Sequence, residues 1–567
     1  MIKNRIDILK KKLSQYNIDG YIIPKNDEFF SEYAANDRLK NISNFTGSAG
    51  MAVVLKKKNY LFVDGRYTIQ AKKESSKYFQ IIEIHKKLPG AVIKDFTLGF
   101  DPQLFTTKIL KRYFLNKNKL ISIDNNLIDE IYKKKFNKNI TKPFFSLNQD
   151  IVGQSHRSKI EQISKFLKFN KSDYLFISAP ENVAWILNIR GYDNPNSPIP
   201  NCRLIIGKNN ELFLIAEKDN TRKIIKENKI RKKQLIYPNY FENLINKLKG
   251  KNFIVDNQSC SIFFEKIISS KFNILNANDP TYKFKSIKNA HEIKHMIETH
   301  KKDGLALTRF IYWIKNNKKD NLTEIDAQNK LEKFRKLNKD YLFPSFNTIA
   351  GTGSNGAIVH YRATNKSSKI IKKNQLFLCD SGGQYKYGTT DVTRTICFSK
   401  QKKSIKNIFT KVLKGHIAVA LTNLKKDKTG KQIDLKARKF LKKDGLDYAH
   451  GTGHGVGFFL NVHEGPQSIS RYNSIIIQKG MVLSNEPGFY KKGKFGIRIE
   501  NLVFAKQNKK RLYFENLTLA PIEKDLINYK LLNKNEKNYL FRYHLSIYAQ
   551  HSKFLNSKER KWLASLI

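Results

Sequence analysis

The sequence predicts a protein of mixed α/β and α+β class, with two related α/β domains, a larger mixed domain and a short C-terminal appendix. Three observations lead to this fold class. A helix–strand–helix pattern occurs twice in the first third of the chain, a long amphipathic helix is expected after residue 285, and short apolar strands with Gly-rich connections fill residues 376–501. A chain of 567 residues can hold three or four domains of about 100–200 residues each.

The repeated pattern indicates an internal duplication. Apolar residues recur at helical spacing over residues 6–13 and again over 160–167, and each helix leads into an apolar strand, at 21–23 and at 174–177. The apolar helix positions are Ile6, Leu9, Leu13, Ile160, Ile163 and Leu167. After each strand we expect a polar turn and a second helix, from Asn26 and from Glu181. Such a repeat predicts two successive α/β domains.

Interruptions of the pattern suggest the domain boundaries. NQDIVGQSH (148–156) breaks the helical spacing near Asp150, and the turn-rich NANDPTY (276–282) precedes a second break near Phe284. The expected domains are residues 1–150, 151–284, 285–506 and 507–567.

A long helix is expected to open the third domain from Ser286, with one apolar face. That face would carry Ile293, Ile297, Gly304, Leu307 and Ile314. The C-terminal appendix is expected to be helical from about Glu536.

The formal net charge of +56 could indicate a protein that binds nucleic acid or an anionic surface. The lysines, however, are spread from Lys3 to Lys561 and accompany many Asn, Ile, Tyr and Phe residues, which is typical of an AT-rich genome. No nucleic-acid-binding module or base-stacking motif accompanies the charge. We therefore expect no specific nucleic-acid partner.

The cysteines and the N-terminal sequence favour the cytoplasm. Four cysteines without paired spacing suggest a reducing compartment, and Cys379, within an apolar run, is expected to be a core residue. Residues 1–15 carry frequent charges and lack the apolar stretch of a secretory signal. No run of about 18 apolar residues occurs, so we expect no membrane partner.

Five potential metal ligands lie in the last third of the chain. They are Asp380, Asp391, His454, Glu486 and Glu500. Four carboxylates and one imidazole could be buried together only if cations neutralised them. Many oxygens, one nitrogen and no thiolate suit manganese or another fairly hard divalent ion, with zinc or cobalt as alternatives. Two such ions about 3.5–4 Å apart can hold a bridging hydroxide and polarise a carbonyl, which predicts hydrolysis.

The acidic candidates lie beside predicted strands. The apolar run LFLCD ends at Asp380, a Gly-rich connection follows, and DVTRTICF begins a neighbouring strand at Asp391. Glu500 is expected on a strand with alternating apolar residues. Each residue also has an ordinary explanation, because an Asp after a strand often serves a turn and Glu500 could pair with Arg498 on one strand face. Their combination in this order favours one shared site.

Several motifs together resemble the pita-bread metallopeptidases, and above all the cytosolic, three-domain aminopeptidase P (Xaa-Pro aminopeptidase) family. The motifs are NGAIVHYRAT (355–364), LCDSGGQYKYGTTDVTRT (378–395), HGTGHGVGFFLNVHEGP (450–466), NEPGFY (485–490) and FGIRIEN (495–501). Segments 44–50, 63–71, 181–191 and 543–567 extend the resemblance over nearly the whole chain. It implies two creatinase-N-like α/β domains followed by a pita-bread metallopeptidase domain and a C-terminal extension.

The resemblance assigns a role to each ligand. Asp380 would chelate one metal alone, Asp391 and Glu500 would bridge both metals, and His454 and Glu486 would complete the second site. Glu486 would also take a proton from the attacking water as general base.

Four further residues would serve the substrate. His360 and His463 would stabilise the tetrahedral intermediate or the leaving nitrogen. His450 would line the pocket for the proline ring, and Arg498 is a further candidate for substrate binding.

The implied activity is removal of an N-terminal residue that precedes proline. Proline lacks an amide N–H and has a fixed φ, so peptidases that need this donor fail on Xaa-Pro bonds. The substrates would be peptides with proline at the second position, and the family implies a homodimer.

Other functions remain alternatives. Prolidase cleaves dipeptides but typically has one leading domain, methionine aminopeptidases usually lack both leading domains, and creatinase-like relatives use the fold without metal. A non-enzymatic pita-bread binding module is a further alternative, against which the complete ligand set argues.

A different metal motif occurs on the long predicted helix. His291, Glu292 and His295 spell H-E-x-x-H, in which two histidines on one helical face bind zinc. No third ligand is near in the sequence, and this stretch matches the entry helix of the aminopeptidase P family. We expect a structural role, with Ile293 and Ile297 on the core face and Glu292 pointing to water.

Overall fold

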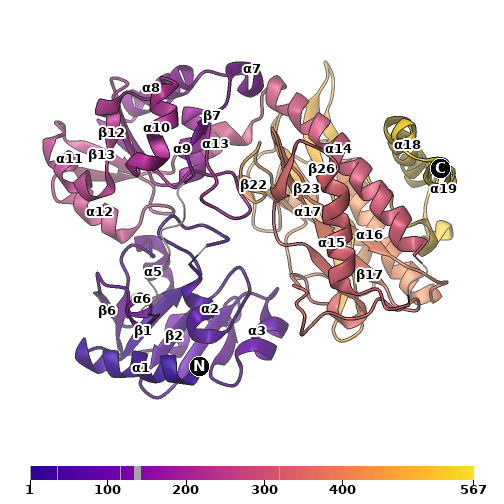
Figure 1. Cartoon of the computed structure of the whole chain (residues 1–567), viewed down its shortest axis with the longest axis horizontal. Coiled ribbons are helices and arrows are strands. Elements are labelled where there is room, and N and C mark those ends of the chain that lie inside the picture. The colour runs from indigo at the N-terminus through magenta and orange to yellow at the C-terminus, as the bar shows by residue number, and fades with distance from the viewer. Residues whose placement is uncertain (1, 35, 115–116, 133–141, 318–319) are drawn as a thin grey trace. The chain divides into compact units, whose positions relative to one another are not determined.

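The computed structural model describes residues 2–34, 36–114, 117–132, 142–317 and 320–567. The chain forms two compact units, residues 1–282 and residues 283–567 (Figure 1).

The first unit begins with a six-stranded sheet in the order β4-β3-β2-β1-β5-β6. Its strands are β1 (Gly20–Pro24), β2 (Met51–Leu55), β3 (Asn59–Val63), β4 (Gln80–Glu83), β5 (Thr97–Phe100) and β6 (Lys119–Ser122). β2 pairs antiparallel with β1 and β3. The β1–β5, β5–β6 and β3–β4 pairs are parallel.

A second six-stranded sheet, in the order β12-β11-β10-β8-β13-β14, repeats this topology. Its strands are β8 (Tyr174–Ile177), β10 (Arg203–Gly207), β11 (Leu212–Ile215), β12 (Leu235–Ile236), β13 (Asn252–Val255) and β14 (Asn273–Asn276). Each pair has the same sense as its counterpart in the first sheet. The predicted duplication of an α/β domain is therefore confirmed.

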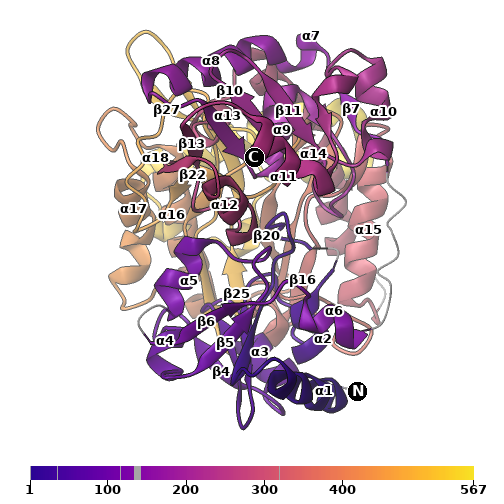
Figure 2. The same cartoon turned by 90° about the vertical axis from the view of Figure 1, so that its left-hand side faces the viewer.

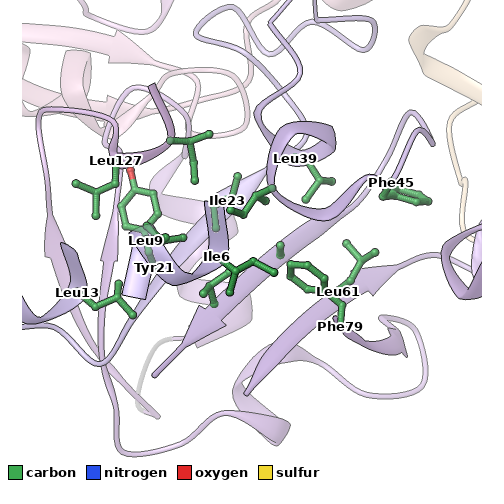
Figure 3. Packing of buried hydrophobic residues seen from close by; sticks show 14 of the residues in the cluster. Ile6, Leu9, Leu13, Tyr21, Ile23, Leu39, Phe45, Leu61, Phe79 and Leu127 are labelled. Atoms are coloured by element: carbon green, nitrogen blue, oxygen red, sulfur yellow. The ribbon is translucent and has the colours of Figure 1, made fainter. Parts of the chain in front are cut away.

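Helices cover both faces of the first sheet. Because all of β1 is buried, its side chains alternate between two cores: Tyr21 and Ile23 contact the layer with α1 (Ile2–Gln15), whereas Ile22 contacts the layer with α5 (Thr107–Phe114). Figures 1 and 2 show α1 and α5 on opposite sides of this sheet. Figure 3 shows the predicted helix residues Ile6, Leu9 and Leu13 in the first of these cores.

The equivalent helix of the second copy is α8 (His156–Phe169), and its predicted apolar positions are also buried. Glu181 lies in the expected second helix, α9 (Pro180–Leu187). The matching prediction at Asn26 is wrong, because turns follow β1 and the next helix is α2 (Arg38–Ser43). The Asp27 carboxylate accepts hydrogen bonds from the backbone N–H groups two and four residues later, which favours a turn over a helix.

Short elements complete the first unit. They are α3 (Thr68–Ser75), α4 (Pro89–Val92), α6 (Leu127–Tyr132), β7 (Phe145–Ser146), α7 (Gln149–Val152), β9 (Ile189–Arg190), α10 (Lys218–Lys226), α11 (Phe241–Lys247), α12 (Ile262–Ser269) and α13 (Thr281–Ser286), of which α13 runs into the second unit.

The second unit contains short, mostly antiparallel strands in several sheets. The orders are β15-β18-β19, β16-β17-β20, β22-β21-β23-β26-β27 and β24-β25. The strands are β15 (Tyr341–Pro344), β16 (Ile349–Thr352), β17 (Phe377–Ser381), β18 (Gly383–Tyr385), β19 (Gly388–Thr389), β20 (Val392–Ile396), β21 (Gly453–Gly455), β22 (Glu464–Ile469), β23 (Val482–Asn485), β24 (Gly488–Lys491), β25 (Phe495–Arg498), β26 (Asn501–Gln507) and β27 (Leu512–Asn516).

Two pairs of helices pack on these sheets. α14 (Ala290–Lys315) and α15 (Glu324–Lys336) share a core with β17 and β20, and α16 (Lys403–Ala420) and α17 (Gly430–Lys442) share one with β23 and β26. Within these pairs, α14 contacts α15 and α16 contacts α17, and Figure 2 draws α15 and α16 well apart. The helices therefore support the strands from which the predicted ligands project.

The start of the second unit differs from the prediction. Two helices, α13 and α14, replace the single helix expected from Ser286. Gly304, Leu307 and Ile314 are buried as expected, but Ile293 and Ile297 are only half-buried. Glu292 is buried rather than exposed, because its carboxylate closes a capping box with Asn289 at the start of α14. Periodicity alone could not distinguish this cap from a solvent-facing acid.

Residues just before α14 are fixed to two strands. Ile287 forms a bridge with Met481, and the Lys288 N–H donates to Gly480 O at 3.0 Å. The ammonium of Lys288 is ion-paired with Glu464, and Lys285 Nζ lies 3.6 Å from the other oxygen of this carboxylate. All three side chains are at most 2% exposed. The segment before α14 is therefore anchored by a buried Lys–Glu–Lys cluster.

The C-terminal appendix is helical, as predicted, with α18 (Lys534–His551) and α19 (Ser557–Ala564). Leu540, Tyr543 and Ile547 of α18 pack in one core with α16. The strand β26 crosses the predicted boundary at residue 506 and pairs with β27. The domain boundaries themselves remain predictions.

All four cysteines are buried and free. Cys379 lies in β17, where burial raises the pKa of its thiol to about 12, as expected for a core residue. None of the described helices has both the length and the apolar character needed to cross a membrane.

Candidate metal centre

Two paired strands hold the aspartates. β17 and β20 pair antiparallel, with Asp380 opposite Thr393, and Asp391 directly precedes β20. The predicted neighbouring strands are confirmed, and the Gly-rich connection between them contains the hairpin β18–β19. Both aspartate side chains are buried.

The other three candidates come from the adjacent sheets. His454 is the middle residue of β21, and Glu486 follows β23. Glu500 lies between β25 and β26 rather than on the strand predicted for it. Its backbone N–H donates to Thr393 O at 3.1 Å, which ties this gap between strands to β20.

The five side chains meet in one place. His454 Nε2 lies 3.4 Å from Asp391 Oδ2 and 3.7 Å from Glu486 Oε1. Ligand atoms of Asp391, His454 and Glu500 lie within 4.8 Å of one another. Glu500 Oε2 accepts a hydrogen bond from Thr393 Oγ1 at 2.8 Å. Residues that lie up to 120 positions apart in the chain, from Asp380 to Glu500, therefore converge on one site.

The cluster carries excess negative charge. Burial, followed by the charge of Asp391, raises the pKa of Asp380 to about 6, although Arg498 opposes the shift. Burial also raises the pKa values of Glu486 and Glu500, and neighbouring carboxylates add to both shifts. Burial would lower the pKa of His454, but Asp391 and Glu486 outweigh it and raise the pKa to about 9. Such shifts are expected where cations are needed to balance the charge.

One carboxylate oxygen of Asp380 also indicates the need for a cation. Asp380 Oδ2 accepts a hydrogen bond from Arg498 Nη2 at 2.6 Å, whereas Oδ1 is buried with no hydrogen-bond partner among the described residues. A buried carboxylate oxygen without a partner is costly, and a bound cation would satisfy it. The donor set and this oxygen therefore fit a site for hard divalent ions.

Arg498 links the centre to a tyrosine and a histidine. Its Nε donates to Thr393 Oγ1 at 3.0 Å, and its Nη1 donates to Tyr490 OH at 2.6 Å. Tyr490 OH also lies 2.9 Å from His450 Nε2. The alternative in which Arg498 pairs with Glu500 on a strand face is wrong, since its carboxylate partner is Asp380.

Tyr490 was not among the predicted site residues. It stands at the end of the quoted motif NEPGFY, but its contact with Arg498 depends on the pairing of β24 with β25. Only the motif could have drawn attention to it. Substrate binding by Arg498 remains a prediction, because its side chain is 2% exposed and all three guanidinium nitrogens contact protein groups.

The three histidines predicted to serve the substrate have different neighbours. The rings of His463 and His454 have centroids 4.3 Å apart, and His450 Nδ1 lies 3.7 Å from Glu486 Oε2. His360 lies on a turn after the 3-10 helix η3 (Gly353–Asn355). Its neighbour Val359 places a carbonyl oxygen 3.5 Å from Arg498 Nη2. The turn of His360 thus borders the residues that hold Asp380.

The H-E-x-x-H motif does not form a ligand cluster in the described part of the chain. His291 is exposed, Glu292 caps α14, and the His295 ring contacts Tyr387 edge-on with centroids 5.3 Å apart. The expected structural role is confirmed for Glu292 through the cap.

Comparison with known proteins covers the whole chain. The sequence model of metallopeptidase family M24 matches residues 294–507, and that of its C-terminal region matches 510–566. Two models of the creatinase/prolidase N-terminal domain match residues 5–131 and 137–292. A protein of Laccaria bicolor described as a probable Xaa-Pro aminopeptidase P is 36% identical, over 99% of this chain and 92% of that protein.

The chain belongs to metallopeptidase family M24.

Two further relatives of this M24 chain are also described as Xaa-Pro or X-prolyl aminopeptidases. A probable Xaa-Pro aminopeptidase P of Coprinopsis cinerea is 34% identical over 98% of this chain and 96% of that protein. The crystal structure of X-prolyl aminopeptidase from Caenorhabditis elegans, described as a cytosolic enzyme with a di-nuclear active site, matches with a TM-score of 0.90 and 28% identity. The match covers 100% of this chain and 99% of that one.

A prolidase from Pyrococcus furiosus also matches, with a TM-score of 0.51 and 25% identity, over 63% of this chain and 99% of its own. The predicted M24 fold with two creatinase-type N-terminal domains is therefore confirmed, as is the resemblance to aminopeptidase P.

Proposed function

We propose that this M24 chain is a metal-dependent aminopeptidase that hydrolyses the N-terminal Xaa-Pro peptide bond. The observation that carries the proposal is the convergence of four buried or half-buried carboxylates and one imidazole, with Asp380 Oδ1 left without a hydrogen-bond partner in the part of the chain that the structure describes. Relatives matched over almost the whole chain carry the name Xaa-Pro aminopeptidase P.

Two divalent metal ions fit the donor set. Asp380 would hold one ion alone, Asp391 and Glu500 would be shared by both, and His454 with Glu486 would complete the second site. Manganese is favoured because oxygen ligands outnumber the single nitrogen. When bound, the ions would polarise the scissile carbonyl and lower the pKa of the attacking water.

Protein groups supply proton transfer and charge stabilisation. Glu486 is suited to act as general base because its pKa is raised by burial, which brings it nearer to working pH. His463, beside His454, would donate a hydrogen bond to the oxygen of the tetrahedral intermediate or to the leaving nitrogen. His360 would act with it from the turn that borders Arg498.

The substrate would be a peptide with proline at its second position. His450 would line the pocket for the proline ring, with its own ring held by Tyr490 and by the Gly451 carbonyl, which lies 2.8 Å from Nδ1. Arg498 would keep Asp380 oriented and border the substrate. We further propose a homodimer in the cytoplasm, by analogy with the family.

Prolidase is the second candidate, favoured by the match to the Pyrococcus furiosus structure. That match leaves over a third of this chain uncovered, since it spans 63% of it. The uncovered part disfavours a prolidase, whereas the aminopeptidase matches span both creatinase-type regions.

One assay tests the proposal. Protein loaded with manganese is given an Xaa-Pro dipeptide, an Xaa-Pro-Xaa tripeptide and Met-Ala-Ser. We expect release of the first residue from the tripeptide. Cleavage confined to the dipeptide would identify a prolidase, cleavage confined to Met-Ala-Ser a methionine aminopeptidase, and no turnover of any peptide would contradict a peptidase function.

A further inference from the structure

A buried carboxylate outside the metal centre organises the segment that carries His360. Glu324 is the first residue of α15, and its side chain is completely buried. It has no part in the roles assigned above.

Both oxygens of Glu324 accept several hydrogen bonds. Oε1 accepts from the backbone N–H of Thr352 at 2.7 Å, and Oε2 accepts from the backbone N–H of Lys369 at 3.0 Å. The side-chain amide of Asn355 lies 3.1 and 3.0 Å from the two oxygens. Tyr361 OH donates to Oε2 at 2.8 Å. One carboxylate therefore fixes the beginning, the middle and the end of residues 352–369.

No cation neutralises this carboxylate within the described residues. Its partners are neutral N–H and O–H donors, and its position at the start of α15 places it at the positive end of a helix dipole. Such multiple hydrogen bonding to an anion is strong and directional. An amide in the same place could offer only one acceptor oxygen and would direct its own donors at other donors.

His360 lies between this anchor and the metal centre. Its successor, Tyr361, contacts Glu324, and the carbonyl of its predecessor, Val359, contacts Arg498. The turn also lies directly against β25, since Gly356 O leaves no room for a Cβ on Gly496. The backbone at His360 is thus held from both sides.

We infer that Glu324 is a positioning residue for His360, setting the place of that imidazole through its hydrogen bonds to Tyr361, Asn355 and the backbone of the same segment. The inference rests on the role proposed for His360 in the Xaa-Pro aminopeptidase reaction. It predicts that loss of the Glu324 charge acts on the same catalytic step as loss of His360.

The test is a double-mutant cycle on the full-length, metal-loaded enzyme with an Xaa-Pro-Xaa peptide. Glu324→Gln, His360→Ala and the double variant are compared by kcat, KM and bound metal. We expect Glu324→Gln to lower kcat by about 10- to 100-fold, the scale of a misplaced catalytic group, with a smaller change in KM and two ions retained. In the His360→Ala background the same change should lower kcat less than twofold, because coupled residues are not additive.

Asp326→Asn is the matched control, because it is an acid-to-amide change on the same helical turn whose carboxylate is exposed and caps Thr323. It should leave kcat unchanged. If Glu324→Gln does not fold, Tyr361→Phe removes a single donor to Glu324 and should show a smaller loss of kcat, again absent in the His360→Ala background.

The outcomes separate the two proposals. Losses that multiply in the double variant, or normal kcat in a folded Glu324→Gln enzyme, would overturn the positioning role while leaving the function of His360 intact. Normal kcat in His360→Ala would overturn both the role of His360 and the inference built on it.

Discussion

Arg498 and Asp380 form a buried ion pair in which the carboxylate is only half satisfied. Arg498 Nη2 lies 2.6 Å from Asp380 Oδ2, while none of the described residues forms a hydrogen bond to Oδ1. The guanidinium also contacts Thr393 and Tyr490 through its other nitrogens. Arg498 therefore directs one oxygen of Asp380 away from itself and leaves it available to a metal ion.

Arg498→Lys should weaken both metal binding and turnover. A lysine ammonium keeps the charge but cannot reproduce three contacts set by a planar guanidinium. We expect metal affinity and kcat each to fall by about 10–100-fold, as for other residues that orient metal ligands. Metal titration together with kcat on an Xaa-Pro-Xaa peptide measures both. Unchanged metal affinity and kcat would show that the orientation of Asp380 does not depend on the guanidinium group of Arg498.

Asp391→Asn and Glu500→Gln should each abolish activity and loosen metal. Each change replaces a proposed bridging carboxylate with a neutral amide, so the loss should exceed the roughly 10–100-fold typical of residues that only orient ligands. The control is the pair His291→Ala with His295→Ala, which should retain metal and rate. Near-normal turnover of either carboxylate variant would refute the two-metal assignment, and a metal lost from the control would restore the zinc-motif alternative.

The histidines should separate by role. His454→Ala should lose metal along with rate, because it removes the single nitrogen ligand of the proposed set. His463→Ala and His360→Ala should keep both ions and lose kcat by roughly 10²–10³-fold, the scale of a lost oxyanion donor, with a smaller change in KM. Elemental analysis beside steady-state kinetics decides this. A metal ion lost from His463→Ala, or full kcat in that variant, would contradict the division.

The Lys–Glu–Lys cluster before α14 should be important for stability. Glu464→Gln removes the buried carboxylate that is ion-paired with Lys288 and lies beside Lys285, and breaking a buried pair costs about 3–5 kcal/mol. Glu515→Gln is the matched control, since the Lys506–Glu515 pair is largely exposed and should contribute about 1 kcal/mol or less. Denaturant unfolding of both variants gives the comparison; equal, small losses would argue against the cluster as an anchor.

His544 should make the fold sensitive to mild acid. Burial, followed by nearby positive charges, lowers the pKa of His544 to about 4, and its Nε2 accepts the N–H of Ile522 at 3.2 Å. The unfolded state binds the proton first, so the stability from neutral His544 is complete above about pH 6.5 and is lost as pH falls toward 4. His544→Gln should flatten the fall in unfolding free energy between these values. An identical slope in both proteins would mean that this histidine is not responsible.

The candidate metal ligands could be located from the sequence because their chemistry and their flanking strands are local. Asp380 lies near the end of the apolar strand β17 and Asp391 directly precedes β20, so residue type and position are both visible in a few residues. The turn after β1 could not be predicted, since the Asp27 side chain competes with the helix for backbone N–H groups.

Other features depend on contacts between distant segments. The burial of Glu324 requires α15 to lie against residues 352–369, and the contact of Tyr490 with Arg498 requires β24 to pair with β25. Neither position differs in sequence pattern from an ordinary exposed acid or loop tyrosine. The burial of Glu324 and the contact of Tyr490 are therefore determined by packing between distant segments, and local sequence propensity does not reveal them.

The anchoring of Lys285, Ile287 and Lys288 also limits how far the protein can be shortened. Ile287 and Lys288 contact Met481 and Gly480, which lead into the strand before Glu486, while both lysines contact Glu464, the residue after His463. A truncation that begins at α14 would remove these two cations and leave the buried Glu464 carboxylate without its ion pair. A minimal C-terminal fragment intended for expression should therefore begin upstream of Lys285, even though the family signature starts at residue 294.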